Sequence, residues 1–354
     1  MDDSESDGCN SLPEESRYCQ ETTVCEETCY GTDVEYSYRF SYPRRGVAVI
    51  ICNDRDHEGH RREGSEIDLK CYYNAFSHLG FDVLVLYNEK RAQLLESLKR
   101  VSNEDHSDCD CFVLAVSSHG DKNQYNGVQE DVIFTIDHPV KSKEIMTMFA
   151  DKSCPSLAGK PKLFFIQACR GYDTDSGVDV YSTKASKKQD LPSSCLGNMD
   201  TIDAVRVIHF NNHAAMSIHH NKQQLIPNHT SSKNTANSSL LYETTGGRKV
   251  LQEQGVFMKP VIHPAPCYKD FLVMYSTPPG YYSFRRPDSG SWFVRCLSDV
   301  LLNSDGNTNL MRELTRVTGM VADRYISASS EPLLHDKKQT PVIYSMLSKD
   351  IYLS

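Results

Sequence analysis

One histidine and one cysteine stand where the chain could bring them side by side. His119 follows the apolar run 111–116, and Cys169 follows the apolar run 162–167. A cysteine thiolate beside an imidazole is a nucleophile, and the imidazole delivers a proton to the leaving group. A glycine follows each residue within two positions. The backbone N–H groups of Gly120 and Cys169 would then supply an oxyanion hole for an acyl-transfer reaction.

The two apolar runs belong to an alternation of strands and helices that starts near residue 45. We expect six strands, over 46–52, 81–87, 111–116, 162–167, 270–275 and 341–347. The expected helices cover 65–79, 89–101, 141–150, 290–302 and 308–325. Ser65 and Asp68 predict a capping box at the start of the first helix. This alternation predicts an α/β fold with a mostly parallel sheet that helices cover on both faces. Such sheets bind ligands at the carboxyl ends of their strands, where His119 and Cys169 stand.

The alternation stops between about residues 172 and 265, where Asn, Ser, Thr, His, Lys and Gln dominate. A stretch of this length without secondary structure is usually functional or disordered, and we interpret it as a polar linker. Its five histidines, and three cysteines near the N-terminus, lack the spacing of a metal site, so we expect no bound metal. These residues are His209, His213, His219, His220, His229, Cys19, Cys25 and Cys29.

The negative charge of the chain is concentrated at its N-terminus. The net charge is −9, and residues 1–33 contain ten acidic residues and one arginine. This composition predicts a solvated, disordered tail and leaves the remaining chain close to neutral. A neutral body argues against nucleic-acid binding.

The cysteine count and the lengths of the apolar runs indicate where in the cell the protein is located. Thirteen cysteines occur without CxxC pairs, there is no run of 18 apolar residues, and the first twenty residues do not read as a signal peptide. We therefore expect reduced thiols, no membrane span and a cytoplasmic location.

The pentapeptide Gln167-Ala168-Cys169-Arg170-Gly171, with His119 fifty residues upstream, matches a known signature of caspases. The resemblance extends from about residue 40 to the C-terminus, apart from the linker. Other segments that look like caspase segments, in the family's order, are 62–64, 117–120, 159–163, 175–179, 275–285, 290–293 and 345–347. The chain most resembles short-prodomain executioner caspases. The resemblance implies a three-layer sandwich with a central, mostly parallel six-stranded sheet, and a cysteine endopeptidase without a cofactor.

The resemblance also implies a pocket for a substrate aspartate at P1, the residue before the cut bond. In caspases two arginines and the glutamine of the signature bind this aspartate, and the matching residues are Arg62, Arg285 and Gln167. Paired guanidinium groups suit a carboxylate because they make charge-assisted, bidentate hydrogen bonds. The matching residue that would orient the catalytic His119 is His60, through its backbone carbonyl.

Further substrate subsites are implied with two departures from the executioner pattern. Tyr282, Phe284 and Trp292 match the aromatic walls of the S2 and S4 pockets. Position 286 is Arg, where executioners often carry a smaller polar residue, and the loop 326–335 lacks their usual aromatic residues. Arg286 suits an acidic P4 residue, and the preference for a full Asp-Glu-x-Asp sequence stays open.

Caspases are made as zymogens that are cut between a large and a small subunit. Asp175 is the site we expect, because a small residue follows it, and Asp33 would release the acidic tail. The expected regions are a prodomain over 1–33, a large subunit over 34–175, a linker over 176–265 and a small subunit over 266–354. No aspartate lies between Asp203 and Asp270. We therefore expect the small subunit to keep a long N-terminal arm.

The family implies a role in apoptosis and a set of partners. These are protein substrates with Asp at P1, a second copy of the chain in a dimer of heterodimers, an upstream initiator caspase and inhibitor-of-apoptosis proteins. The prodomain is too short for a death-fold recruitment domain, which favours activation by an upstream protease. The strand near 341–347 matches the family's dimer seam.

Three alternatives remain. A metacaspase would need an acidic pocket, whereas the pocket expected here is basic. A legumain-like enzyme would normally carry a secretion signal. A catalytically weak, caspase-like scaffold or regulator would generally lack the cysteine, the histidine or a pocket arginine, and this chain has all of them.

Overall fold

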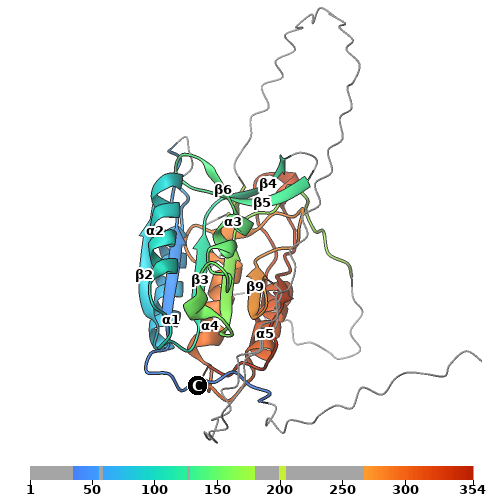
Figure 1. Ribbon diagram of the computed structural model, residues 1–354. Helices are drawn as coiled ribbons and strands as arrows, with labels where there is room; N and C mark the ends of the chain where they lie inside the picture. The colour runs from blue at the N-terminus through green and yellow to red at the C-terminus, as the bar shows by residue number, and fades with distance from the viewer. Residues whose placement is uncertain (1–34, 56–58, 126–127, 180–198, 205–266, 354) are drawn as a thin grey trace, which may run out of the picture.

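The computed structural model describes residues 35–55, 59–125, 128–179, 199–204 and 267–353 (Figure 1). Its centre is a six-stranded sheet with the strand order β12-β9-β7-β3-β1-β2. The strands are β1 (Val47–Cys52), β2 (Asp82–Tyr87), β3 (Phe112–Ser117), β7 (Lys162–Gln167), β9 (Phe271–Tyr275) and β12 (Val342–Ser345). Five strands are parallel, and β12 pairs antiparallel with β9 at one edge. The prediction of a mostly parallel, six-stranded sheet is thus confirmed.

Each central strand supplies side chains to two separate cores. Along β1, Ala48 and Ile50 join one core, while Val49 and Ile51 join the other. The whole strand is buried, and so are β3 and β7. Successive side chains of a strand point to opposite faces, so a strand covered on both faces must be apolar throughout. This explains why these strands are continuous apolar runs.

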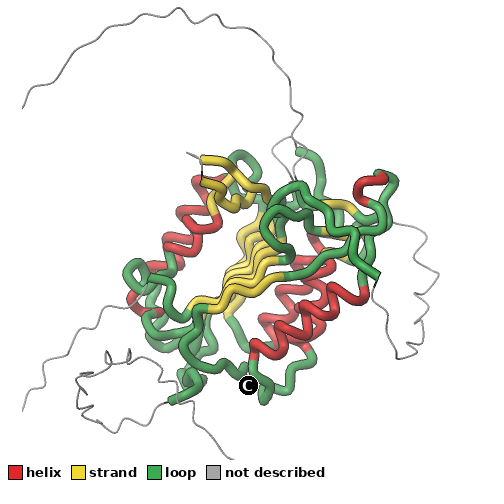
Figure 2. The backbone as a smooth tube through the Cα atoms, turned by 90° about the vertical axis from the view of Figure 1, so that its right-hand side faces the viewer, coloured by secondary structure: helices red, strands yellow, loops and turns green. Residues whose placement is uncertain are grey.

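Helices cover both faces of the sheet (Figure 2). One layer contains α1 (Ser65–His78), α4 (Trp292–Leu302) and α5 (Leu310–Arg324), and α4 packs against the other two. The opposite layer contains α2 (Arg91–Asn103) and α3 (Ser142–Thr147). Two short helices are η1 (Pro155–Leu157) and η2 (Pro332–Leu334). The predicted helices are present, and their ends move by a few residues, most at the C-terminus of α3.

Two small sheets lie outside the central one. The first contains β4 (Gly120–Tyr125), β5 (Val128–Phe134) and β6 (Pro139–Lys141). The second contains β8 (Thr201–Ile202), β10 (Phe284–Arg286) and β11 (Gly290–Ser291). The sequence predicted neither sheet. The strand β8 lies within the expected polar linker, in the described stretch 199–204, and it pairs with β10.

The predicted capping box at the start of α1 is wrong. The N-cap residue is Gly64, with φ of 84°, and it has no side chain to form the cap. A Cβ on this glycine would also lie 2.6 Å from the carbonyl oxygen of Arg286. The hydroxyl of Ser65 donates to the carbonyl oxygen of Arg62, at 2.7 Å. The carboxylate of Asp68 is bound to residues of two other elements, which are described below.

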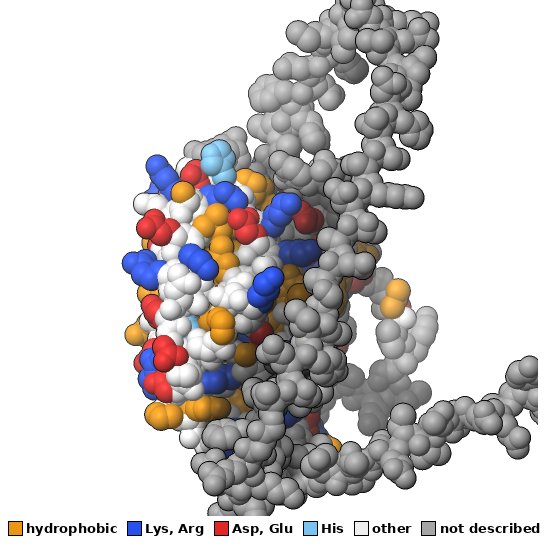
Figure 3. Space-filling view, in the orientation of Figure 1, with side chains coloured by type: hydrophobic (Ala, Val, Ile, Leu, Met, Phe, Trp, Pro, Cys, Tyr) orange, Lys and Arg blue, Asp and Glu red, His pale blue; other side chains and the backbone are white. Residues whose placement is uncertain are grey.

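Several expectations concern residues outside the described ranges. These are the acidic tail, Asp33, the N-terminal cysteines and the five linker histidines. Among the described residues, eight cysteines are free thiols, no group of acidic, histidine or cysteine residues is arranged to hold a metal, and no helix has the length and hydropathy to span a membrane. On the face seen in Figure 3, basic and acidic side chains are interspersed.

Candidate active site

The register of β3 and β7 brings His119 and Cys169 to the same edge of the sheet. Ser117 at the end of β3 pairs with Gln167 at the end of β7. His119 and Cys169 each lie two residues beyond this pair. The parallel pairing therefore places both at the carboxyl edge, where open sheets bind ligands.

Gly120 allows the two strand ends to approach closely. A Cβ at this position would lie 2.5 Å from the carbonyl oxygen of Cys169 and 2.7 Å from the Cβ of Ala168. A larger residue would therefore push the strand ends apart. The N–H of Gly120 donates to the backbone carbonyl of Asp203, at 3.0 Å.

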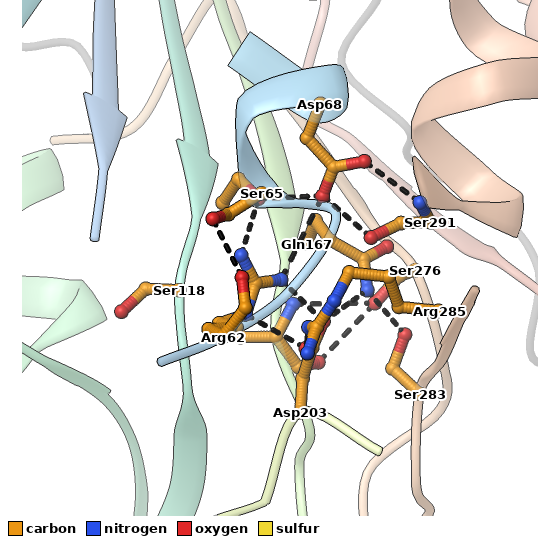
Figure 4. A network of polar contacts seen from close by, with 12 residues as sticks. Arg62, Ser65, Asp68, Ser118, Gln167, Asp203, Ser276, Ser283, Arg285 and Ser291 are labelled. Atoms are coloured by element: carbon orange, nitrogen blue, oxygen red, sulfur yellow. Dashed lines mark hydrogen bonds and ion pairs between the residues drawn. The ribbon is translucent and has the colours of Figure 1, made fainter. Parts of the chain in front are cut away.

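A buried carboxylate occupies the predicted pocket for a substrate aspartate (Figure 4). Asp203 accepts hydrogen bonds from Nε and Nη2 of Arg62, at 2.8 and 2.6 Å, and from Nε2 of Gln167, at 2.6 Å. Nη1 of Arg285 forms an ion pair with the same carboxylate. We call Arg62, Gln167 and Arg285 the aspartate pocket. The structure places these three predicted residues around one carboxylate.

Together with Asp68, the aspartate pocket contains one more positive than negative charge until a second carboxylate enters it. Its two guanidinium groups are buried, and Arg62 has a permanent buried neighbour in Asp68, with 3.7 Å between Nη2 and Oδ2. The carboxylate of Asp68 is held by the hydroxyl of Ser117 and by the N–H and hydroxyl of Ser291, at 2.6 to 2.7 Å. A second carboxylate is required to balance Arg285. Asp203 supplies it, and an uncharged residue would leave a buried charge unpaired.

The charge of Asp203 is stabilised by these contacts. Burial by itself would raise the pKa of this carboxyl group. The attraction of Arg285 and Arg62 outweighs burial and lowers the pKa to about 2. Asp203 is therefore ionised throughout the physiological pH range.

The predicted nucleophile and its partner are both neutral while Asp203 is in place. Burial, followed by the charge of Asp203, raises the pKa of the Cys169 thiol. Burial also lowers the pKa of His119 to about 4, and the charge of Arg62 acts in the same direction. With Asp203 in place, the two groups are therefore a thiol and an imidazole, and the thiolate described above is not yet formed. Nδ1 of His119 is buried and makes no hydrogen bond to a described residue.

A second carboxylate of the same segment lies in the predicted S4 region. Oδ1 of Asp200 accepts from Nε1 of Trp292, at 2.9 Å, and from Nε of Arg286, at 3.0 Å. Oδ2 of Asp200 accepts from the N–H of Ala328, at 2.8 Å. The Trp292 ring is stacked between Phe284 and Tyr325, with centroids 5.0 and 5.1 Å apart. Arg286 and Trp292 therefore meet at one carboxylate.

Three further predicted residues, Tyr282, Asp175 and His60, lie outside the aspartate pocket. Tyr282 packs against the hydrophobic core and makes an edge contact with Tyr172, with the ring centroids 5.9 Å apart. Asp175 is exposed, and its carbonyl oxygen accepts from the N–H of Lys338, at 2.8 Å. Asp175 is thus bound to a surface loop and is outside the aspartate pocket. The described contacts do not test the role of the His60 carbonyl.

Comparison with known proteins decides the family. The model of the caspase domain matches residues 45–352. The chain belongs to the caspase family. It is similar to caspase-7 of Gallus gallus, with 31% identity over 90% of this chain and 80% of that protein. Caspase-3 of Bos taurus is 30% identical over 91% of this chain and 89% of its own length. The crystal structure of caspase-1 from Spodoptera frugiperda has the same fold, with a TM-score of 0.64, 24% identity and coverage of 91% and 95%.

This caspase is a cysteine-type endopeptidase related to executioner caspases. Sequence reasoning missed several residues that complete its site. They are Asp68, Ser117, Asp200, Asp203, Ser283, Ser291, Tyr325 and Ala328. A signal for two of them was present, since Asp200 and Asp203 have the spacing of P4 and P1 and the small residue Ala204 follows.

Proposed function

We propose that this caspase cuts proteins after aspartate, acts as an executioner in apoptosis and is made as a zymogen. The observation that most strongly supports cleavage after aspartate is the Asp203 carboxylate in the aspartate pocket, with its carbonyl oxygen 3.0 Å from the backbone nitrogen of Gly120. The pocket fixes the P1 side chain, and Gly120 fixes the carbonyl that is to be attacked.

The reaction uses the sulfur of Cys169 and the imidazole of His119. The sulfur attacks the P1 carbonyl carbon, and the N–H groups of Gly120 and Cys169 stabilise the negative oxygen. His119 takes the thiol proton and gives it to the departing amine. A water molecule, activated by the same imidazole, then attacks the thioester, which releases the P1 carboxylate and restores the thiol. The neutral forms of Cys169 and His119 carry the proton needed for this cycle.

Specificity for aspartate follows from the charge balance of the pocket. Asparagine at P1 would have nearly the same shape but would leave the buried Arg285 without its counter-charge. Sites that hold a polar substrate group in this way discriminate by about 10⁴-fold or more. The S4 contacts of Arg286, Trp292 and Ala328 support a preference for aspartate at P4.

The proposed assembly is a dimer of large–small heterodimers, joined along β12. This strand is at an edge of the central sheet, where unpaired backbone groups invite a further strand. Tyr344 of this strand and Met346 just after it are exposed. Together with Arg170, Tyr275 and Tyr268 they line a groove that suits a second copy of the chain.

The remaining proposals follow from the family. The substrates are cytoplasmic proteins, and an initiator caspase would cut at Asp175 and Asp33. Inhibitor-of-apoptosis proteins are candidate regulators. The subunit division remains 34–175 and 266–354, with the linker between them.

Fluorogenic tetrapeptides test the proposed function directly. The panel has Asp, Asn, Glu or Arg at P1 and Asp, Val or Leu at P4, and the enzyme is compared with the Cys169→Ala variant. We expect hydrolysis only after Asp, abolished in the variant. No hydrolysis by a chain already cut at Asp175 and freed of the Asp203 carboxylate by the change Asp203→Ala would favour a catalytically weak scaffold instead.

A further inference from the structure

Residues 200–204, which we call the docked segment, lie across the active site as a peptide substrate would. Strand β8 pairs antiparallel with β10, with Ile202 opposite Phe284 and Thr201 opposite Arg285. The N–H of Asp203 donates to the carbonyl of Ser283, at 3.1 Å, and the N–H of Asp200 donates to the carbonyl of Ala328, at 2.7 Å. Adding a strand to an exposed edge is a common way of binding extended peptides.

The side chains of the docked segment match the pockets at both of its ends. Asp203 is in the aspartate pocket and is fully buried. Asp200, three residues earlier, binds Arg286, Trp292 and Ala328. The hydroxyl of Thr201 donates to the carbonyl oxygen of Arg285, at 3.2 Å. The segment thus occupies P4 to P1 with the sequence Asp-Thr-Ile-Asp.

The carbonyl group of the peptide bond after Asp203 lies at the expected oxyanion donor. Its carbonyl oxygen is held by the N–H of Gly120, at 3.0 Å. The sulfur of Cys169 accepts from the N–H of Ser283, at 3.1 Å, and the carbonyl of this same residue accepts from the N–H of Asp203. Ala204 follows as a small, buried residue.

We propose that Cys169 cuts the Asp203–Ala204 bond of its own chain, and that the docked segment blocks the site until then. The inference rests on the proposed function. The sulfur of Cys169 bonds to the Asp203 carbonyl carbon, and the bond to the Ala204 nitrogen breaks. The thiol proton passes through His119 to the Ala204 amine. Water then hydrolyses the thioester, which restores the thiol and leaves a new main-chain carboxylate on Asp203.

This assignment adds a site to the one expected at Asp175. Asp175 is bound to Lys338 and could enter the aspartate pocket only after Asp203 had left it. A chain therefore presents Asp203 to its own cysteine and leaves Asp175 to another enzyme molecule. The small-subunit fragment of the fully cut protein would begin at Ala204.

The test uses the full chain with Asp175→Ala, which removes the other site. We expect fragments of about 23 and 17 kDa, in proportion to the 203 and 151 residues of a 40.0 kDa chain. Intact mass should give Ala204 as the new N-terminus. The additional change Asp203→Ala should slow this cut at least about 100-fold. The control Asp179→Ala, an exposed aspartate of the same region, should leave its rate unchanged.

Dilution separates cutting within a chain from cutting between chains. We expect the first-order rate constant to stay constant over a hundredfold dilution. A rate constant proportional to concentration would overturn the proposal of self-cleavage. Absence of a fragment beginning at Ala204, from a preparation that hydrolyses Asp peptides, would overturn the Asp203 site and leave the proposed function standing. Loss of peptide hydrolysis as well, in an Asp203→Ala chain cut at Asp175, whose aspartate pocket is no longer filled by its own carboxylate, would overturn both.

The docked arrangement can also be tested without peptide-bond cleavage, by the fluorescence of Trp292 in the Cys169→Ala variant. Trp292 is the only tryptophan of the chain, and its Nε1 donates to Asp200. Removing the docked segment from the site should expose Trp292 and shift its emission to longer wavelength. We expect this shift with Asp203→Ala and none with Asp179→Ala. An unchanged spectrum in both variants would contradict the docked arrangement.

Discussion

The docked segment holds two carboxylates, and the protein binds them by different means. Asp203 is enclosed by two buried guanidinium groups and an amide, with side-chain exposures of 0% for Arg62 and 3% for Arg285. Asp200 is bound by one guanidinium that is 21% exposed, an indole N–H and a backbone N–H. A buried charge without its partner is costly, whereas an exposed one is solvated. The P1 pocket should therefore act as a strict requirement and the P4 pocket as a graded preference.

Replacing Arg285 by lysine should have the largest effect, because it removes the strict requirement of the P1 pocket. Lysine keeps the charge but cannot make the guanidinium contacts to the carboxylate and to the carbonyl of Glu63. We expect kcat/KM for Asp peptides to fall at least about 10³-fold. The variant would be cut by tagged wild-type enzyme that is then withdrawn, and assayed on the peptide panel. An unchanged melting temperature would exclude misfolding, and activity within tenfold of wild type would refute the strict pocket.

Acid should release Asp203. Its pKa is about 2 in the folded chain against an ordinary value of 3.8. Because the pKa of Asp203 is lowered, its charge stabilises the docked state at every pH above the ordinary pKa. This stabilisation is lost as the pH falls from about 4 to about 2. It amounts to about 2 kcal/mol.

The measurement compares the free energy of unfolding of Cys169→Ala with that of Cys169→Ala, Asp203→Asn across pH. We expect the difference between the two free energies of unfolding to be constant above pH 4 and to become smaller below it. A difference independent of pH down to about 2 would show that the carboxylate charge contributes nothing to docking.

Arg286→Gln should change only the P4 preference. The charge-assisted bond to Asp200 is partly solvated, so we expect about a tenfold loss of kcat/KM for peptides with Asp at P4. Peptides with Val at P4 should be cut as before. Arg295→Gln, which changes an exposed arginine of α4 that pairs with Asp299, is the matched control. Equal losses for both peptides would mean that Arg286 does not read P4.

Trp292→Phe should have the smallest effect. Phenylalanine keeps a ring between Phe284 and Tyr325 but removes the Nε1–H that donates to Asp200. One neutral donor contributes about 1 kcal/mol, which corresponds to about a fivefold lower P4 Asp preference. The ratio of kcat/KM for Asp over Val at P4 gives this effect directly. A ratio equal to that of the wild type would assign P4 recognition to Arg286 and Ala328 alone.

The sequence predicted the parts of the site that follow from strand order. Apolar runs predicted the sheet, and its register then brings His119 and Cys169 to the same edge. The contacts that arise between distant segments could not be obtained in this way. Asp68 has the spacing of a helix cap, yet it binds Ser117 and Ser291 from other elements. Asp203 lies in a polar stretch, where composition predicts a linker, and only the fold shows that β10 offers it an edge.

Because residues 200–203 of the docked segment lie between two cleavage sites, their release requires both cuts. Once the Asp203 bond is cut, the new carboxyl end remains tethered to the large subunit through residues 176–202. A tethered product rebinds at a high effective concentration, so this cut alone leaves the site largely occupied. A second cut, at Asp175, turns residues 176–203 into a free peptide that can diffuse away. The enzyme would then respond to the coincidence of its own cut and one made by another protease.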